Sequence, residues 1–372
     1  MSIENPSAER SVVVRAPVNI ALIKYWGKWD EELMIPANDS ISVSIDALFA
    51  ETRLSLVDEG EDAAVVNGER VDLEKSRRFG RVFRKFREEA FGRPDGPPFV
   101  QLDSRTNFPT AAGLASSAAG FAAVAFGLAK LGGLSEDQTV RLARAGSGSA
   151  CRSVLPGFVH WISGGRPISV ADRAECDRRT ECRTLPDPSG LCSRLRAVIF
   201  VLSGQQKDVP STSGMQRTLE TSGLMERRIA VDVPERVAQL KAAIAAGDFG
   251  GVAAVTMADS DHLHAVCADT RPPLHYLNED SRRLIAFVRE FNGTDGPPRV
   301  AYSFDAGPNC CCFLEEADVP EFLAAFAAHF RLAPPDAAVL RTGVWRPTGG
   351  DLRLQSIVIS TVGGAPEVVD RS

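Results

Sequence analysis

The feature that most restricts the fold is a run of small residues from Pro109 to Gly120, which continues as an apolar stretch to Leu131. A small-residue loop that enters a helix exposes backbone N–H groups at the helix N-terminus, where the dipole favours an anion. Ser116 and Ser117 add hydroxyl groups for a phosphate or Mg²⁺. No Walker A pattern, GxxxxGK[ST], occurs in the chain. The run predicts a phosphate-binding loop before a buried helix, and the alternative is a helix that only packs against a sheet.

Strand and helix signals are mixed along the rest of the chain without a strict βαβ order, which favours the α+β class. At 372 residues two domains are expected, and the polar, irregular stretch 165–193 suggests a division into 1–195 and 196–372. A terminal strand of the second domain is a candidate for return to the first. The expected strands are 11–15, 41–45, 52–57, 99–102, 196–202, 300–304 and 356–362, and the expected helices are 74–90, 116–131, 135–145, 211–225, 230–246, 249–265, 278–291 and 320–328.

Composition and charge exclude several classes of protein. The net charge of -6 and the lack of a dense basic run argue against a nucleic-acid binder. No stretch approaches the roughly 20 apolar residues that span a bilayer, so no membrane association is expected. The first ten residues lack an apolar signal core, which predicts a cytoplasmic protein. The eight cysteines lack close metal-binding spacing, so neither zinc nor disulfides are expected, and Cys310 to Cys312 should form a buried strand.

Two lysines lie close together in the segment APVNIALIKYWGK (16–28). If this segment is helical, Lys24 and Lys28 share a face, because residues four apart meet on a helix. They would repel each other by roughly a few tenths of a kcal/mol unless an anion lay between them. The segment therefore indicates an anion site, and the alternative is a pair of solvated surface lysines.

Two further segments carry an arginine and a carboxylate. In GSGSACRS (146–153), small residues precede Arg152, whose planar fork suits a carboxylate or phosphate. Asp305 ends an apolar strand and precedes a Gly-Pro turn, so its carboxylate is well placed to point into a cleft. The alternatives are a tight turn with an exposed arginine and an Asx-type turn cap.

The segment KDVPSTSGM (207–215) leads into a helix, and Ser211 or Thr212 is expected to be its N-cap. His262 and His264 do not suggest a metal site, because residues two apart on a helix point in different directions. Together the motifs supply a phosphate loop, lysines, an arginine and a carboxylate, spread along the chain as a cleft between two lobes would require. They predict phosphoryl transfer, in which a protein positions groups and neutralises charge.

These segments resemble diphosphomevalonate decarboxylases of the GHMP kinase superfamily. The resemblance implies a GHMP-kinase-like two-domain fold, with the active-site cleft between an N-terminal α/β domain and a C-terminal α+β domain. It implies a homodimer that uses ATP and Mg²⁺ to phosphorylate the 3-hydroxyl of mevalonate 5-diphosphate, with loss of phosphate and CO₂ to give isopentenyl diphosphate. The matching segments are 16–28, NFPTAAGLASSAAG (107–120), 146–153, 207–215, MADSDHLHAVCADTRPPLHYLN (257–278) and FDAGPN (304–309).

The resemblance also implies a role for individual residues. Asp305 matches the catalytic aspartate near the 3-hydroxyl, and Lys24 matches the lysine of the phosphoryl-transfer site. Arg152 matches the arginine that holds the substrate carboxylate, and Asn19 matches the amide that orients it. The other implied substrate-binding residues are Tyr25, Lys28, Ser147 and Ser149. The implied ATP-binding residues are Asn107, Ala112, Gly113, Leu114, Ala115, Ser116, Ser117, Lys207 and Ser211, with Ser116 and Ser117 also as Mg²⁺ ligands.

Three residues depart from the family pattern. Trp29 stands where a basic residue is expected, Asp39 where serine is usual, and Gln206 where a second lysine is common. Two fewer cations and one more anion weaken the attraction for a polyanion. The alternatives are therefore a phosphomevalonate decarboxylase, which acts on mevalonate 5-phosphate, and a mevalonate-type kinase that does not decarboxylate. A binding protein without catalysis is disfavoured because the key lysine, arginine and aspartate are all present.

Overall fold

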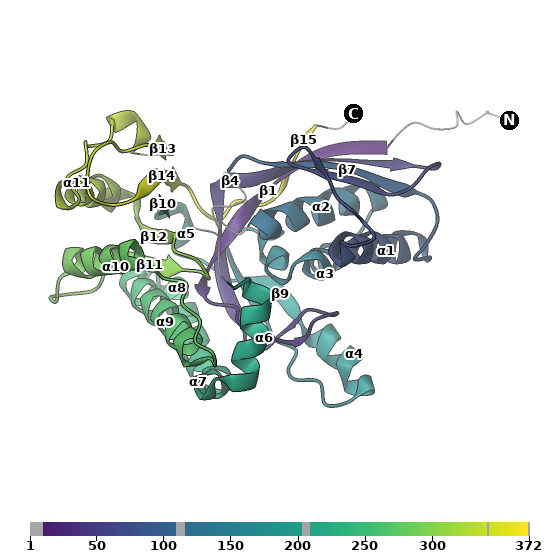
Figure 1. Cartoon of the computed structure of the whole chain (residues 1–372), viewed down its shortest axis with the longest axis horizontal. Helices are drawn as coiled ribbons and strands as arrows, with labels where there is room; N and C mark the ends of the chain where they lie inside the picture. The colour runs from purple at the N-terminus through teal and green to yellow at the C-terminus, as the bar shows by residue number, and fades with distance from the viewer. Residues whose placement is uncertain (1–9, 109–115, 203–208, 341, 371–372) are drawn as a thin grey trace.

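The computed structural model describes residues 10–108, 116–202, 209–340 and 342–370 (Figure 1). Two larger sheets and a two-stranded ribbon lie within these residues. In strand order the first sheet is β15 (Glu367–Asp370), β1 (Arg10–Ile23), β4 (Ser40–Val57), β7 (Phe99–Thr106), β5 (Ala63–Val66) and β6 (Glu69–Arg70), with β8 (Phe158–Ile162) beside β4 and β9 (Glu181–Thr184) beside β8. The second sheet is β11 (Val300–Phe304), β12 (Cys310–Glu315), β10 (Leu195–Leu202), β14 (Leu354–Ser360) and β13 (Gly343–Trp345).

β1 is longer than the sequence predicted. It was expected to end at Arg15, but it continues to Ile23 and pairs antiparallel with β4 along most of its length. The segment 16–28 is therefore a strand and a turn, and a helix that puts Lys24 and Lys28 on one face is wrong. The reason lies in its burial: every residue from Ala16 to Ile23 is buried, so the segment reads as a nearly continuous apolar run without the alternation of a half-buried strand.

Three helices cover one face of the first sheet, as Figure 1 shows. They are α1 (Arg77–Phe91), α2 (Ser116–Gly132) and α3 (Glu136–Gly146). α2 lies directly against β1 and β4, and its small residues permit this approach: a Cβ added to Gly127 would lie 2.3 Å from Cδ1 of Leu54. The buried helix predicted at 116–131 is confirmed, and this packing fixes where its N-terminus points.

The stretch 165–193 is not irregular, contrary to the prediction. It contains α4 (Val170–Arg179), β9 and the short α5 (Leu191–Arg194). α4 begins with Ser169, whose hydroxyl accepts a hydrogen bond from the backbone N–H of Asp172. Cys176 is the one buried residue of α4, so the helix carries no apolar periodicity that a sequence pattern could reveal.

The second sheet packs against helices 249–269 and 279–292, and further helices pack on the first of these. The helix expected at 211–225 is two helices, because the chain turns at Ser222, which caps the second of them. The interior strand β12 holds Cys310 to Cys312, which are buried as predicted, and all eight cysteines are free. The helices are α6 (Ser211–Thr221), α7 (Gly223–Arg227), a π-helical turn (Arg228–Asp232), α8 (Val233–Ala246), α9 (Phe249–Asp269), α10 (Glu279–Asn292) and α11 (Val319–His329).

The two sheets are joined by direct contacts. The Ser360 hydroxyl at the end of β14 accepts the backbone N–H of Ala47 in β4, and the Ser303 hydroxyl of β11 donates to the carbonyl of Ala21 in β1. The chain then returns to the first sheet, where β15 pairs with β1. The division into domains 1–195 and 196–372 stays a prediction.

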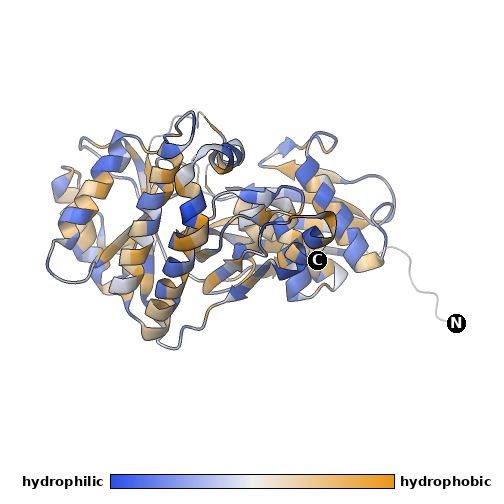
Figure 2. Ribbon diagram, turned by 90° about the horizontal axis from the view of Figure 1, so that it is seen from below, coloured by the Kyte–Doolittle hydropathy of each residue, from blue (hydrophilic) through white to orange (hydrophobic). Residues whose placement is uncertain are grey.

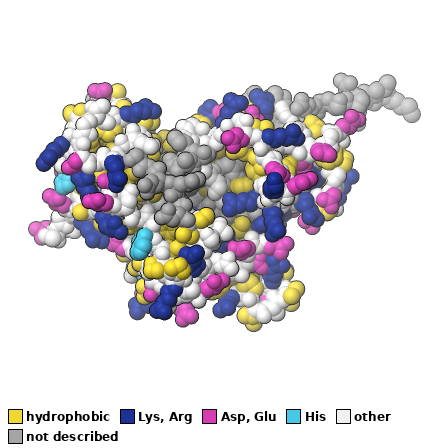
Figure 3. All heavy atoms as spheres, in the orientation of Figure 1, with side chains coloured by type: hydrophobic (Ala, Val, Ile, Leu, Met, Phe, Trp, Pro, Cys, Tyr) yellow, Lys and Arg dark blue, Asp and Glu magenta, His cyan; other side chains and the backbone are white. Residues whose placement is uncertain are grey.

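The described surface is polar and mixed in charge. Figure 2 shows helices that carry hydrophobic residues along one side and hydrophilic residues along the other. On the face shown in Figure 3, Lys and Arg side chains are interspersed with Asp and Glu. Within the described residues, every helix is too short or too polar to cross a membrane.

Candidate active site

A cavity of about 590 Å³ lies where the end of β1 meets the start of α2 and the end of β11. A 3₁₀ helix (Gly148–Ser153) and the start of α6 complete its walls. The cavity gathers most of the residues that the sequence singled out, although they come from distant parts of the chain. The predicted site residues that line it are Asn19, Lys24, Tyr25, Lys28, Ser116, Ser117, Ser147, Ser149, Arg152, Ser211 and Asp305.

Lys24 and Asp305 form an ion pair at the centre of the site. Lys24 follows β1 directly and Asp305 follows β11, so each side chain is held at the end of a buried strand. Nζ of Lys24 donates to Oδ1 of Asp305 at 2.6 Å, and the side chains are 2% and 38% exposed. The lysine is thus almost fully enclosed, while part of the carboxylate remains accessible from the cavity.

Arg152 is held in place by Asn19. Its Nε–H donates to Oδ1 of Asn19 at 3.1 Å and to the hydroxyl of Ser42 at 3.0 Å, while Nδ2 of Asn19 donates to the carbonyl of Ser149 at 2.9 Å. Burial lowers the pKa of Arg152, and its guanidinium lies 5.6 Å from the ring centre of Trp161. Nη1 is buried and has no hydrogen-bond partner within the described structure. A buried cationic N–H of this kind calls for an anionic partner.

Tyr25 lies beside this arginine. Its ring packs against Trp161 with 4.7 Å between the ring centres, and its hydroxyl is buried without a hydrogen-bond partner among the described residues. Burial raises the pKa of Tyr25, so the phenol is neutral. A Cβ on Gly148 would lie 3.2 Å from this hydroxyl, so the small residue keeps space open there. The unpaired phenol is suited to a polar group of a bound substrate.

Two helix N-termini and several serines also line the cavity. α2 begins at Ser116 and α6 at Ser211, and both residues line the cavity. The hydroxyls of Ser117 and Ser147 lie 3.3 Å apart. Neither Ser211 nor Thr212 is the N-cap of α6, contrary to the prediction: Pro210 holds that position and no side chain caps the helix. The N–H groups of the first turn are therefore left for another acceptor, since Pro210 has no side-chain acceptor to offer them.

One cation at the cavity was missed by the sequence reasoning. Arg78 of α1 lines the cavity together with Lys28, which begins β2 (Lys28–Asp30). Burial lowers the pKa of Lys28, and the charges of Arg78 and Arg81 act in the same direction, whereas Glu31 opposes them. Arg78 belongs to a charged helix whose sequence looks like an ordinary solvated face, so no pattern distinguished it.

One described residue of the predicted site does not line the cavity, and others lie outside the described residues. Asn107 lies outside the lining, where its amide accepts the backbone N–H of Phe49 at 2.9 Å and donates to the carbonyl of Ala47 at 2.8 Å. It joins the end of β7 to the middle of β4. The predicted residues Ala112, Gly113, Leu114, Ala115 and Lys207, together with Gln206, lie outside the described residues.

Two of the unusual residues also lie away from the cavity lining. The guanidinium of Arg166 sits 4.9 Å from the ring centre of Trp29. The carboxylate of Asp39 bonds with Nε2 of His160 at 2.9 Å and accepts the backbone N–H of Ser163 at 2.8 Å. Neither residue lines the cavity, so Asp39 adds no anion to its wall.

Comparison with known proteins identifies the family of the chain. A family model for the diphosphomevalonate decarboxylase-like N-terminal domain matches residues 16–172, and one for the mevalonate 5-diphosphate decarboxylase C-terminal domain matches residues 197–344. The chain belongs to the diphosphomevalonate decarboxylase family. A relative from Bos taurus is 41% identical over 89% of this chain and 83% of its own length. A relative from Candida albicans is 43% identical over 87% and 90%.

Solved structures of this family share the whole fold. The mevalonate diphosphate decarboxylase from Trypanosoma brucei has a TM-score of 0.84 and 34% identity, and the alignment covers 97% of this chain and 98% of that one. Another similar structure, with a TM-score of 0.79 and 29% identity over 98% of this chain and all of the other, is a complex with MVAPP, AMPPCP and magnesium. The α+β class and the family predicted from the sequence are confirmed.

Proposed function

We propose that this protein decarboxylates mevalonate 5-diphosphate in an ATP-dependent reaction that yields isopentenyl diphosphate, CO₂, ADP and phosphate. Membership of the family supports the reaction, and one observation in the chain carries it. The Lys24–Asp305 pair and Arg152, whose buried Nη1 has no hydrogen-bond partner among the described residues, line the same cavity. A phosphoryl acceptor that also bears a carboxylate would use both.

Asp305 and Lys24 have different roles in the phosphorylation of the 3-hydroxyl. Asp305 aligns this hydroxyl and takes its proton as the oxygen attacks the γ-phosphate of ATP. Lys24 orients the carboxylate of Asp305 through their hydrogen bond and offers positive charge to the phosphoryl group during transfer. The C3–O bond then breaks with loss of phosphate, and the electron pair of the C–CO₂ bond becomes the alkene as CO₂ leaves.

Arg152 binds the carboxylate that is later lost. Asn19 and Ser42 take its Nε–H, which turns the remaining N–H groups toward the cavity. The planar fork suits a carboxylate, and burial strengthens the attraction. Tyr25 adds a neutral hydroxyl beside it.

The phosphates lie at the two polar ends of the cavity. Lys28 and Arg78 neutralise the diphosphate of the substrate, while the N-termini of α2 and α6 receive the phosphates of ATP. The hydroxyls of Ser116 and Ser117 fit a Mg²⁺ held mainly by phosphates and water, and the described residues contain no cluster of three His, Cys, Asp or Glu for a protein-only metal site. The ion would neutralise charge on the transferred phosphoryl group.

The positions of Trp29 and Asp39 favour the diphosphate over mevalonate 5-phosphate. Because both residues lie outside the cavity lining, neither changes the charge of its wall. Lys28 and Arg78 together supply two cations at one end, which matches a diphosphate better than a monophosphate. The cytoplasmic location and the homodimer stay predictions from the sequence.

The test is to incubate the protein with ATP, Mg²⁺ and mevalonate 5-diphosphate labelled with ¹⁴C at C1. We expect labelled CO₂ and ADP in equal amounts, and a higher kcat/KM than with the monophosphate. ADP without CO₂ would identify a kinase, and a higher kcat/KM with the monophosphate would identify a phosphomevalonate decarboxylase.

A further inference from the structure

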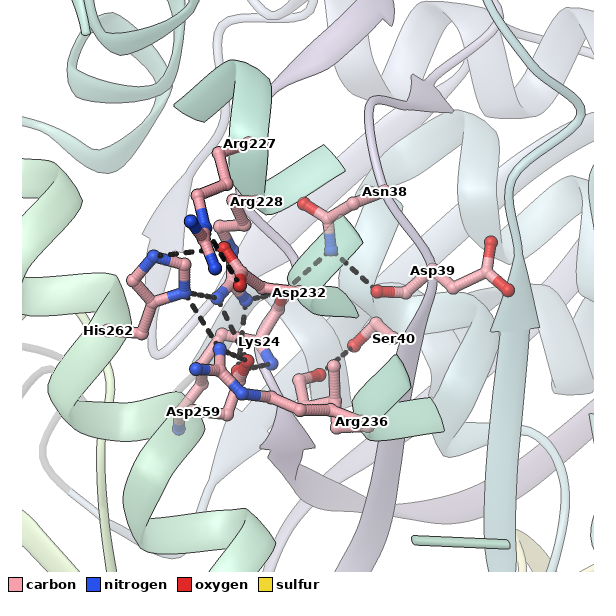
Figure 4. A network of polar contacts seen from close by, with 11 residues as sticks. Lys24, Asn38, Asp39, Ser40, Arg227, Arg228, Asp232, Arg236, Asp259 and His262 are labelled. Carbon is pink, nitrogen blue, oxygen red and sulfur yellow. Dashed lines mark hydrogen bonds and ion pairs between the residues drawn. The ribbon is translucent and has the colours of Figure 1, made fainter. Parts of the chain in front are cut away.

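A buried ion pair between Arg228 and Asp259 contacts the catalytic lysine (Figure 4), and neither of its residues lines the cavity. Arg228 and Asp259 are both fully buried, and they form two parallel hydrogen bonds of 2.8 Å and 2.9 Å. Such a pair is a poor source of stability, because desolvating two charges costs about as much as their attraction returns. The presence of this buried pair therefore calls for an explanation other than folding stability.

The pair binds both polar groups of the Lys24 backbone. Oδ2 of Asp259 accepts the Lys24 N–H at 2.7 Å, and Nη2 of Arg228 donates to the Lys24 carbonyl at 2.9 Å. Asn38 donates to the same carbonyl at 2.9 Å. Lys24 has just left β1, so no sheet partner fixes its peptide groups. The ion pair from the helices of the second half of the chain takes that place.

Ser260, the residue after Asp259, holds the backbone next to Asp305, the other member of the catalytic pair. Ser260 follows Asp259 in α9, and its hydroxyl accepts the backbone N–H of Phe304 at 3.0 Å. Phe304 immediately precedes Asp305. One turn of α9 therefore binds the backbone at Lys24 and the backbone next to Asp305, and it links two strands from different sheets.

The charges around Asp259 keep its carboxylate ionised. Burial by itself raises the pKa of Asp259, but the charge and hydrogen bonds of Arg228, the Lys24 N–H and the charge of Arg236 lower it below its ordinary value. Arg236 donates to Oδ1 of Asp259 at 3.0 Å and contacts Nδ1 of His262 at 2.7 Å. Burial and the two arginines lower the pKa of His262, so it is a neutral acceptor.

We propose that Arg228, Asp259 and Ser260 are positioning residues for phosphoryl transfer, which set the distance between Nζ of Lys24 and the carboxylate of Asp305. Among the described residues, their hydrogen bonds reach the cavity lining only at the backbone of Lys24, so they act on the geometry of the transition state and not on the binding of either substrate. The inference rests on the proposed function, because it needs the Lys24–Asp305 pair to do chemistry.

The experiment compares Arg228→Lys with Arg87→Lys. Arg87 forms an equally bidentate pair with Asp62, at 2.9 Å and 3.0 Å, in the helix-and-sheet layer away from the cavity. Both changes keep the charge and remove the fork, so both should lower Tm. Only Arg228→Lys should lower kcat, by about 10- to 100-fold, because a misplacement near 1 Å costs up to about 100-fold. The KM for ATP and for mevalonate 5-diphosphate should change less than about threefold.

Ser260→Ala supplies a second, milder variant in case Arg228→Lys does not fold. It removes one hydroxyl and should also lower kcat without raising either KM. Wild-type kcat in a folded Arg228→Lys or Ser260→Ala protein, or a loss expressed only in KM, would overturn the positioning role. Failure of the proposed function looks different, since the wild-type protein itself would release no CO₂.

Discussion

Nζ of Lys24 lies 2.6 Å from Oδ1 of Asp305, although 281 positions separate the two residues in the chain. Lys24 follows β1, a long strand of the first sheet, and Asp305 follows β11, an edge strand of the second. Their meeting depends on the docking of the two sheets, so the reactive centre exists only in the complete fold.

Asp305→Asn should abolish most of the turnover. The amide keeps the size of the side chain but cannot accept a proton, so kcat should fall by about 10²- to 10⁴-fold while the Kd for substrate changes little. Stopped assays of CO₂ release and calorimetric binding measure the two quantities. A variant that keeps its turnover and only melts at a lower temperature would show that Asp305 is a turn residue without a chemical role.

Arg152→Lys should weaken recognition of the carboxylate. Lysine keeps the charge but loses the planar fork and the bond from Nε to Asn19, so kcat/KM should fall by about 10²-fold or more. Arg144→Lys is the matched control, because Arg144 is equally buried but bonds with the carbonyl of Thr180 outside the cavity. Similar losses in both variants would point to a structural role for Arg152.

Tyr25→Phe should make the substrate-free protein more stable and should weaken substrate binding. The hydroxyl is buried without a partner, so its removal should raise the free energy of unfolding of the substrate-free protein by about 1 kcal/mol. The same change should raise the KM for mevalonate 5-diphosphate, because a hydrogen bond to the substrate is lost. Denaturant unfolding and steady-state kinetics test the two effects. A less stable variant with an unchanged KM contradicts the assignment.

Arg78→Ala should discriminate between the two candidate substrates. Arg78 and Lys28 line the end of the cavity assigned to the diphosphate, so removal of one cation should cost more with the diphosphate than with the monophosphate. We expect kcat/KM to fall at least about tenfold more for mevalonate 5-diphosphate. Arg81→Ala on the same helix is the control, since Arg81 bonds with the carbonyls of Glu31 and Glu32. Equal losses for both substrates would place the second phosphate elsewhere.

The stability of the protein should fall in mild acid because of His264. Burial and the charge of Lys24 lower the pKa of His264 to about 4, although Asp305 and a hydrogen bond with Phe304 act in the opposite direction. The unfolded chain, with an ordinary pKa of about 6.5, binds the proton more readily. The neutral His264 therefore leaves the free energy of unfolding undiminished above pH 6.5. As the pH falls from 6.5 toward 4, the free energy of unfolding decreases by at most about 1.4 kcal/mol per pH unit. Urea unfolding of His264→Gln between pH 7 and pH 5 should show a smaller slope than wild type, and identical slopes would refute this.

The chemistry could be predicted from short segments of the sequence. Three local patterns could be interpreted without the tertiary structure: the small residues before Ser116, the strand end at Asp305 and the small residues before Arg152. Loop conformation and the direction of a strand end depend on neighbouring residues, so these patterns are informative by themselves. The same local reasoning failed for the segment 16–28. Its apolar run belongs to a strand buried on both faces, and burial on both faces removes the alternation that identifies a strand.

By itself, then, the sequence indicated the kind of reaction and most of the residues that line the cavity, since their chemical types and spacing are properties of the chain. Only the tertiary structure decided that Arg78 joins the cavity, that Asn107 does not, and that Arg228 and Asp259 bind the backbone of Lys24. In the sequence these residues look like ordinary surface charges or a loop amide. Their roles arise when distant segments are packed together, because burial and the loss of water turn a common charge into a fixed hydrogen-bonding group.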